Sequence, residues 1–260
     1  MEVGGRQIRY LETGGQNEGR PIVLVHGFGG DLNNWLFVQP ALTERHRVLA
    51  LDLPGHGGST KEVGAGDLGA LSAALSGFLN AIDVVKAHLV GHSLGAAVVL
   101  RTALDHPSQV ASLTLISPAG LGEEIDEAFT RDFIAASRRK QLEPVLAKLV
   151  VDPSLVSREM IEDVLRFKRL DGAREALTAI QAANFAGGQR EVLRERLGEL
   201  GDIPVQVIWG AEDQIIPAHQ GESLPATVRV HVLRGAGHVP HMEKATEVSG
   251  LVQEFVAQHT

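Results

Sequence analysis

Short apolar runs, many of them rich in β-branched residues, alternate along the chain with longer segments of helical period. The runs are predicted to form strands at 21–27, 46–55, 86–93, 111–118, 203–210 and 228–235. The amphipathic segments between them predict helices at 66–82, 94–107 and 243–258. Short strands without a polar face suit a parallel sheet that helices cover on both sides. The segment 6–13 alternates polar and apolar residues, which predicts an antiparallel edge strand.

The regular spacing of the predicted strands stops at Pro118, and the next strand is predicted only from residue 203. The stretch between them is charged and helical in period, and a structureless loop of that length is uncommon in a compact domain. We expect 119–199 to be a predominantly helical lid over the carboxyl ends of the strands. Residues 1–118 and 200–260 would then form an α/β core with a mostly parallel sheet of about eight strands.

Composition narrows the classes of function. The chain has 260 residues, 44% hydrophobic and 22% charged, as in globular proteins, and a net charge of −8 that disfavours nucleic acid and anionic membranes as partners. It has no cysteine, which excludes disulfides, thiolate zinc sites and a cysteine nucleophile. No stretch is long and apolar enough to span a bilayer, and the first residues lack the apolar segment of a signal peptide. We therefore expect a cytoplasmic protein that binds neither membrane nor nucleic acid.

A serine lies between two glycines at the end of the predicted strand 86–93. The sequence Gly91-His92-Ser93-Leu94-Gly95 is a G-x-S-x-G pattern, and the predicted helix 94–107 follows it directly. A serine in such a sharp strand-to-helix turn presents its Oγ, and the glycines leave room for the turn. The helix N-terminus adds unpaired N–H groups where negative charge develops in acyl transfer. Ser93 is the candidate nucleophile, against the interpretation of a glycine-rich turn with an inert serine.

A serine hydroxyl needs a base, and the chain has 11 histidines. In enzymes built on a strand–serine–helix turn, the acid and the histidine follow the serine, on loops after late strands. His238 lies in the loop after the last predicted strand, behind two glycines. Its neighbour His241 is expected to start the last helix, and His92 is too close to Ser93 along the chain to reach Oγ. We therefore expect His238 to be the base.

An acid must orient the imidazole and stabilise its charged form. The segment WGAEDQIIP follows the predicted strand 203–210 and carries Asp213, with Glu212 as the second candidate. Asp52 also ends a strand, but it precedes the serine and is expected to tie its own turn by hydrogen bonds. Asp213 is the candidate acid.

The turn after the predicted strand 21–27 is the candidate oxyanion hole. It leaves the N–H of Phe28 free to converge with that of Leu94, and two such donors lower the barrier by several kcal/mol. The turn lacks the lysine of a phosphate-binding loop, and His238 with His241 has no third ligand for a metal. We expect no metal and no cofactor. Residues that could line a substrate pocket are His26, Gly27, His92, Trp35, Phe129, Phe133 and Phe185.

With these residues assigned, the chain resembles the α/β-hydrolase superfamily over nearly its full length. Ser93 at the turn is unlike the dehalogenase and epoxide-hydrolase branches, which use a carboxylate nucleophile. The segments HGFGGDLNNWLF, ALDLPGHGGSTK, ISPAGLGEEID, FKRLDG and AEDQIIPA are similar to the C-terminal hydrolase domain of the acetoin dehydrogenase E2 component. That family carries an N-terminal lipoyl domain and is described as a dihydrolipoyllysine-residue acetyltransferase. This chain starts at the hydrolase domain, so we expect an excised domain or a free-standing relative.

The residues and the resemblance together predict a serine-dependent acyl hydrolase or acyltransferase. Its substrate would be a small ester or thioester, and the resemblance implies association with an acetoin dehydrogenase complex. Two alternatives stay open. One is a carbon–carbon bond hydrolase of aromatic degradation, which has a similar ISPAGLG segment but usually asparagine where this chain has His92. The other is a catalytically silent binding or scaffold domain.

Overall fold

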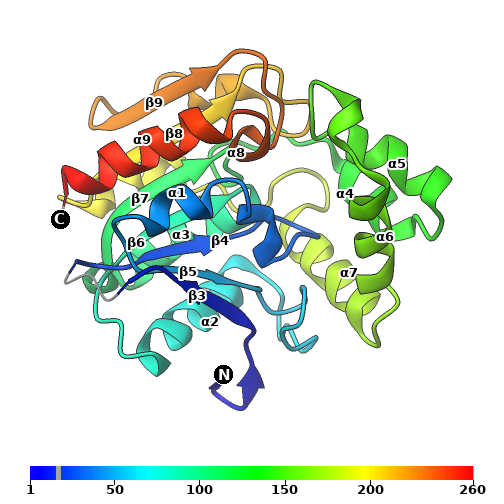
Figure 1. The fold of residues 1–260 in the computed structure, drawn as a ribbon, viewed down its shortest axis with the longest axis horizontal. Helices are drawn as coiled ribbons and strands as arrows, with labels where there is room; N and C mark the ends of the chain where they lie inside the picture. The colour runs from blue at the N-terminus through cyan, green and yellow to red at the C-terminus, as the bar shows by residue number, and fades with distance from the viewer. Residues whose placement is uncertain (16–18, 260) are drawn as a thin grey trace.

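A seven-stranded sheet forms the centre of the computed structural model, which describes residues 1–15 and 19–259 (Figure 1). β3 pairs antiparallel with β5, and all the other neighbours are parallel. The mostly parallel sheet and its predicted strands are confirmed. In spatial order the strands are β3 (Tyr10–Thr13), β5 (Val48–Leu51), β4 (Ile22–Val25), β6 (Ala87–His92), β7 (Val110–Ile116), β8 (Val205–Gly210) and β9 (Val228–Leu233).

The sheet has seven strands rather than about eight, and the predicted edge strand 6–13 divides into two short strands. Its second half is β3. Its first half, β2 (Arg6–Gln7), instead pairs with β1 (Glu2–Val3) in a separate two-stranded hairpin.

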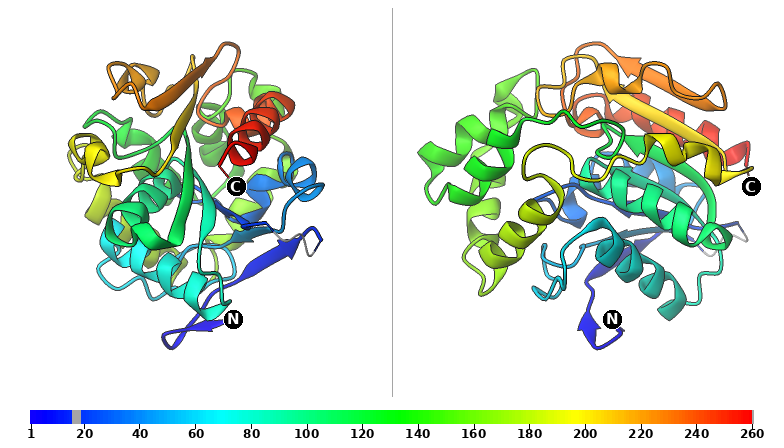
Figure 2. Two further views of the ribbon diagram at one scale, coloured as in Figure 1. Left: turned by 90° about the vertical axis from the view of Figure 1, so that its left-hand side faces the viewer. Right: turned by 180° about the vertical axis from the view of Figure 1, so that it is seen from behind.

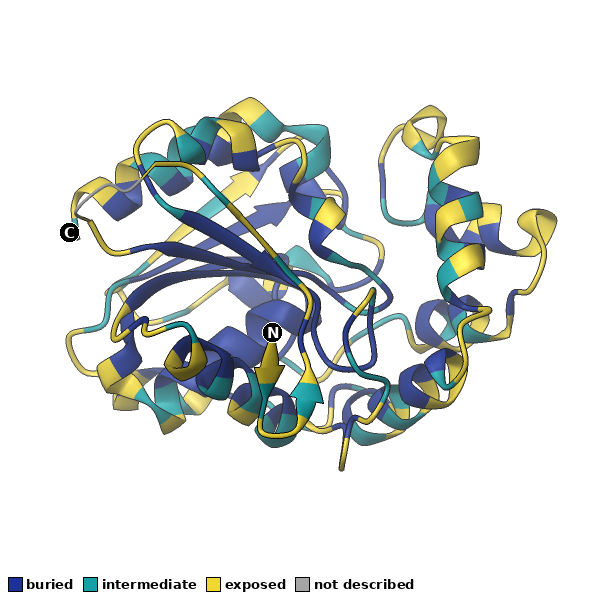
Figure 3. Ribbon diagram, turned by 60° about the horizontal axis from the view of Figure 1, so that its bottom comes forward, coloured by how far each residue is buried: buried dark blue, intermediate teal, exposed yellow. Residues whose placement is uncertain are grey.

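Both faces of the sheet are buried, as the apolar runs predict. In β4, Ile22 and Leu24 pack into the cluster that holds α1 (Gln39–Thr43) and α9 (Ala245–Ala257). The alternate residues Val23 and Val25 pack on the other side, against α2 (Leu68–Ala81) and α3 (Leu94–Asp105). Figure 3 shows the buried strands between these two helical layers, whose exposed residues face outward. A strand that contacts apolar side chains on both faces has no need of polar positions.

Four α-helices lie between β7 and β8, grouped together beside the sheet (Figures 1 and 2). They are α4 (Glu127–Ala135), α5 (Arg139–Ala147), α6 (Arg158–Phe167) and α7 (Ala173–Asn184). The Lys168 ammonium, directly after α6, donates hydrogen bonds to the carbonyls of Phe133 and Ala136 at the end of α4. This contact holds two of the four helices together. The remaining short helices are η1 (Leu32–Trp35), η2 (Pro107–Gln109), η3 (Pro153–Leu155), η4 (Arg194–Leu200), η5 (Ala218–Gly221) and α8 (Pro240–Glu243).

Within the described ranges, no helix combines the length and the apolar character that crossing a membrane requires.

Six buried histidines give the fold a sensitivity to acid. Loss of hydration lowers the pKa of each imidazole, to about 4 for His88 and about 3 for His241. The other four are His26, His46, His56 and His92. These side chains are uncharged in the folded protein at pH values where the unfolded chain takes up protons. The free energy of unfolding therefore falls as the pH is lowered from the ordinary histidine pKa of 6.5.

We predict that His88→Asn makes the pH dependence of stability shallower. One group that titrates only in the unfolded state contributes a slope of up to about 1.4 kcal/mol per pH unit between its two pKa values. Urea unfolding between the two pKa values of His88 should show the variant losing less stability per pH unit than the wild type. Replacement of the exposed His219 is the control. An unchanged slope in His88→Asn would contradict the assignment.

Candidate active site

Ser93 connects β6 to α3 and has a strained backbone. Its φ of 52° and ψ of −117° place it in a conformation that side-chain-bearing residues rarely adopt. Its N–H donates to the carbonyl of Ile116 at 2.9 Å, and its own carbonyl accepts from the N–H of Ala96 and Ala119 at 3.0 and 3.1 Å. The neighbouring strand and the following helix therefore hold the strain in place.

The two glycines of the G-x-S-x-G pattern are required by sterics. A Cβ on Gly91 would lie 2.4 Å from the carbonyl oxygen of Gly95, and one on Gly95 would lie 2.2 Å from that of Val25. Both contacts are with backbone, which cannot move aside. Glycine is therefore required at both positions because α3 lies so close to the ends of β4 and β6.

His238 and Asp213 meet at the carboxyl end of the sheet. Asp213 follows β8 and His238 follows β9, and Nδ1 of His238 lies 2.8 Å from Oδ2 of Asp213. A carboxylate accepts only, so Nδ1 carries the proton and Nε2 of the neutral ring keeps its lone pair. The side chains of His238 and Asp213 are 3% and 0% exposed, so solvent screens the pair little.

The Asp213 carboxylate is held by further donors. Oδ2 also accepts from Nε1 of Trp209 at 3.1 Å, while Oδ1 accepts from the N–H of Ile215 at 2.8 Å and of Ile216 at 3.0 Å. With the bond from His238, four hydrogen bonds fix the direction of this carboxylate. The arrangement suits an acid that orients a histidine.

The other candidates for acid and base have different partners. Oε2 of Glu212 accepts from the N–H of Gly235 and Ala236, at 3.0 and 3.2 Å. Asp52 accepts from the N–H of Leu32 and Gly58, at 2.8 and 2.7 Å, so it ties its own turn as expected. His241 lies in α8 with its ring stacked against Trp35 and His92, at centroid distances of 4.9 and 4.5 Å.

The turn after β4 is fixed by the imidazole of His26. Nε2 accepts from the N–H of Leu53 at 3.0 Å, so Nδ1 carries the proton and donates to the carbonyl of Gly27 at 2.8 Å. The N–H groups of Phe28 and Leu94 donate to no acceptor among the described residues. Both donors thus remain available, as an oxyanion hole requires.

His92 links the turn at Ser93 to the loop that carries His238. Its Nε2 lies 2.8 Å from the carbonyl oxygen of His238 and must donate to it, because a carbonyl only accepts. The His92 ring is 5% exposed and packs with its Nδ1 against Gly27, where a Cβ would lie 2.8 Å away. Residues from three loops are in this way packed around Ser93.

A cavity of about 670 Å³ opens between these loops and helices α4 to α6. Ser93 and His238 line it together, although Ser93 Oγ makes no hydrogen bond within the described part of the chain. Nucleophile–base hydrogen bonds are often long before substrate binds. Of the predicted pocket residues, those in the wall are Gly27, His92, Phe129, Phe133 and Phe185, and the candidate oxyanion-hole residue Phe28 lies there too.

Two predicted pocket residues lie outside the cavity wall, which corrects that expectation. The Trp35 side chain is fully buried on the far side of η1, in the cluster with α1 and α9. His26 is equally buried, and its two ring nitrogens are used by the carbonyl of Gly27 in its own turn and by the N–H of Leu53 after β5. Aromatic character indicates burial, but it does not tell which side of the backbone a side chain occupies.

Charge around the cavity is of one sign. No lysine or arginine of the described residues lines it, whereas Asp31, Glu159 and Asp163 do. Glu159 and Asp163 are exposed residues of α6, and Asp163 is paired with Arg166 at 3.0 Å. The inner wall is mostly aromatic and aliphatic, with Phe28 lying edge-on to Phe133 and Phe185 at centroid distances of 5.9 and 6.1 Å.

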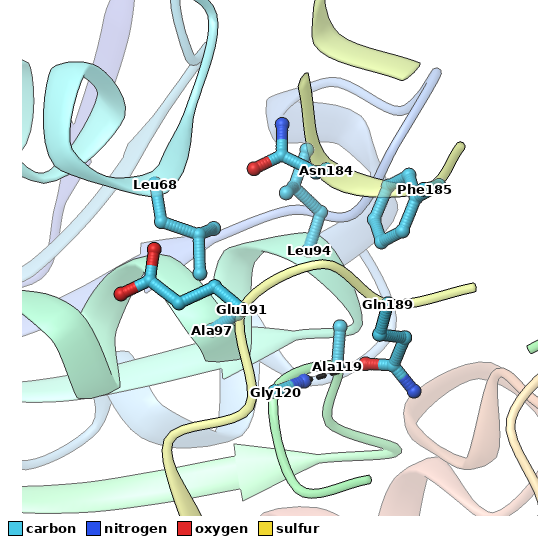
Figure 4. A pocket seen from close by; sticks show the side chains of 9 residues that line it. All are labelled: Leu68, Leu94, Ala97, Ala119, Gly120, Asn184, Phe185, Gln189 and Glu191. Carbon is cyan, nitrogen blue, oxygen red and sulfur yellow. Dashed lines mark hydrogen bonds between the residues drawn. The ribbon is translucent and has the colours of Figure 1, made fainter. Parts of the chain in front are cut away.

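A second cavity lies behind Leu94 but is too small for a substrate. It measures about 10 Å³, room for roughly one water molecule. Figure 4 shows its lining, including the hydrogen bond of 2.6 Å from the Gly120 N–H to Oε1 of Gln189. In the part of the chain that the structure describes, no three histidine or acidic side chains gather in a way that could hold a metal ion.

Sequence reasoning missed the wall that α5 and α6 supply. Leu146 lies in the last turn of α5, Leu149 and Val150 lie directly after this helix, and Met160 and Val164 lie on α6. The helical period of these segments shows that one face is apolar. It does not show whether that face meets another helix or an open cavity, so no sequence signal would have selected these residues.

The fold and the residues around Ser93 define a class of protein. The chain matches the alpha/beta hydrolase fold over residues 20–245 and belongs to that family. Among individual proteins, it is 49% identical to the dihydrolipoyllysine-residue acetyltransferase component of the acetoin cleaving system from Pseudomonas putida, over 99% of this chain and 69% of that protein.

Two more distant relatives are hydrolases. The 2-hydroxy-6-oxo-6-phenylhexa-2,4-dienoate hydrolase of Comamonas testosteroni is 29% identical, over 96% of this chain and 91% of its own length. The solved structure of a meta-cleavage product hydrolase from Pseudomonas fluorescens superposes with a TM-score of 0.88 at 25% identity, covering 99% of this chain and 97% of that one. The chain is thus an α/β hydrolase related to the acetoin-system component.

We predict that Asp213→Asn lowers ester turnover about a thousandfold or more, because an amide can present its NH₂ to His238 and favour the wrong tautomer. Glu212→Gln is the matched control, since it removes the neighbouring carboxylate, which accepts only backbone N–H groups. Its turnover should stay within about tenfold of the wild type. Steady-state kinetics on a simple ester measure both variants, and the reverse ranking would move the acid to Glu212.

Proposed function

We propose that this α/β hydrolase is a serine-dependent acyl hydrolase or acyltransferase that works through an acyl-enzyme. The observation that carries the proposal is the buried His238–Asp213 pair in the cavity that also holds the strained Ser93. A catalytically silent domain would have no physical need for a strained serine, a paired histidine and two free N–H donors at one place.

The proposed reaction uses Ser93 Oγ as nucleophile toward the carbonyl carbon of an ester or thioester. Nε2 of His238 accepts the hydroxyl proton, and the N–H groups of Phe28 and Leu94 stabilise the negative oxygen of the tetrahedral intermediate. Collapse of that intermediate breaks the bond to the leaving group, which takes the proton from His238. The acyl group on Ser93 then passes to water or to a thiol, which His238 deprotonates in turn.

Helices α4 to α7 serve as a lid in this proposal, with 119–199 as the inserted segment. Leu146 on α5, Leu149 directly after it, Val164 on α6 and the aromatic residues of α4 close the cavity on the side away from the sheet. An apolar cover excludes bulk water and strengthens the electrostatic interactions of the site. The lid would also determine which acyl groups enter.

The charge of the cavity favours uncharged or cationic substrates. A carboxylate that enters an apolar cavity without a cation loses part of its hydration, and nothing in the cavity replaces it. Asp31 and Glu159 at the wall would repel it further. The carbon–carbon hydrolase alternative is supported by the relative whose name specifies a dienoate, which is a carboxylate. The lack of any lysine or arginine among the described wall residues weighs against that alternative.

The relative at 49% identity suggests the substrate. We infer that the physiological acyl group is acetyl, carried as a thioester on a dihydrolipoyl group, and that the protein acts together with an acetoin-cleaving complex. Dihydrolipoamide is uncharged and extended, which suits the apolar cavity described above.

We predict that S-acetyl-dihydrolipoamide is cleaved with a kcat/KM about five- to tenfold higher than S-acetyl-dihydrolipoate, because the two differ only in a terminal amide against a carboxylate. Thiol release measures both, and Ser93→Ala, which removes the nucleophile, should abolish both. Equal rates would contradict the charge argument. Cleavage of simple esters but of neither thioester would leave a plain esterase.

A further inference from the structure

The carboxylate of Glu243 joins the candidate histidine loop to the helices over the cavity. Glu243 is the last residue of α8, shortly after His238. Its Oε2 accepts from the N–H of Gly237 at 2.6 Å, and its Oε1 accepts from the N–H of Val151 at 2.7 Å. The two donors come from segments far apart in the chain, one beside the candidate base and one directly after α5.

A third hydrogen bond runs alongside these two. The N–H of His238 donates to the carbonyl of Leu149 at 2.9 Å. The two backbones are so close that a Cβ on Gly237 would lie 2.8 Å from that carbonyl oxygen. Three hydrogen bonds thus fasten residues 149–151 to residues 237–238, two of them through the carboxylate of Glu243. These three bonds form the Glu243 clamp.

Glu243 has no other task among the described residues. It forms no ion pair with any of them, and its two oxygens are used by the two backbone donors. Hydrogen bonds from N–H groups to a carboxylate are shorter and stronger than those to a neutral acceptor. A glutamine would place its NH₂ against one of the donors, so only a carboxylate satisfies both.

The segment that Glu243 holds also belongs to the cavity wall. Leu149 and Val150 line the cavity, as does His238. A shift of either backbone would therefore move the imidazole and the wall together. A displacement of about 1 Å at a catalytic group can lower a rate a hundredfold.

We propose that Glu243 is a positioning residue that sets the imidazole of His238 against the α5 segment, so that the base and the cavity wall are aligned by one carboxylate. The inference rests on the proposed function, in which His238 is the base. Glu243 itself touches no reacting atom and acts through the loop.

The test compares Glu243→Gln with Glu247→Gln, an exposed glutamate on the neighbouring helix α9. Ester hydrolysis, the rate at which a fluorophosphonate labels Ser93, hydrogen exchange and thermal unfolding are measured on the full chain. For Glu243→Gln we expect kcat and the labelling rate to fall about tenfold or more. The KM for a short acyl ester should stay within about twofold, since such a substrate makes few wall contacts.

Hydrogen exchange reports on the clamp without using activity. The amides of Val151, Gly237 and His238 should exchange faster in Glu243→Gln, while those of β6 and α3 should not change. Glu247→Gln should resemble the wild type in every measurement. Lowered thermal stability with kcat and labelling unchanged would show a merely structural carboxylate and overturn the proposal.

Glu243→Asp provides a milder variant if Glu243→Gln does not fold. It keeps the charge, but its side chain is one methylene too short to reach both donors. Its kcat should be lower than that of the wild type, because one of the two backbone donors loses its acceptor. A wild-type kcat in the folded variant would overturn the proposal. Absence of Ser93-dependent turnover in the wild type would refute the proposed function instead, and exchange would still decide whether the clamp exists.

Discussion

The hydrogen bond between His238 and Asp213 is the interaction on which the candidate site depends. It joins the loops after β8 and β9, and the carboxylate is in turn fixed by Trp209 and two backbone N–H groups. Because the pair is buried, solvent does not weaken it, and its geometry determines which nitrogen of His238 is free. The glycine-enforced turn at Ser93 lines the same cavity as His238, and the hydrogen bonds of Glu243 hold the segment after α5 against the loop that carries His238.

The sheet could be predicted from sequence because its strands are apolar on both faces. The strand-to-helix turn at Ser93 could be predicted because it follows from local sterics. Ser93 stands out since Gly91 and Gly95 have no alternative at that turn. The hairpin at residues 2–7 was not predicted, because two-residue strands have no recognisable period.

The direction of individual side chains could not be predicted. Trp35 was expected at the pocket and lies beneath it, because an aromatic residue next to a functional turn can be buried on either side. Glu243 gave no signal at all. It appears in the sequence as one glutamate before a helix, and its partner Val151 lies 92 residues away. Contacts of that kind depend on tertiary packing, which no local pattern records.

The central claim is that Ser93 becomes acylated, and mass spectrometry of a trapped intermediate tests it most directly. The protein is mixed with an acetyl thioester, quenched in acid within the first turnovers, and digested. We expect one acetyl group on the peptide that contains Ser93, and none in the Ser93→Ala variant treated in the same way. Rapid turnover by the wild type with no acyl group on that peptide, or with the group on another residue, would contradict the account.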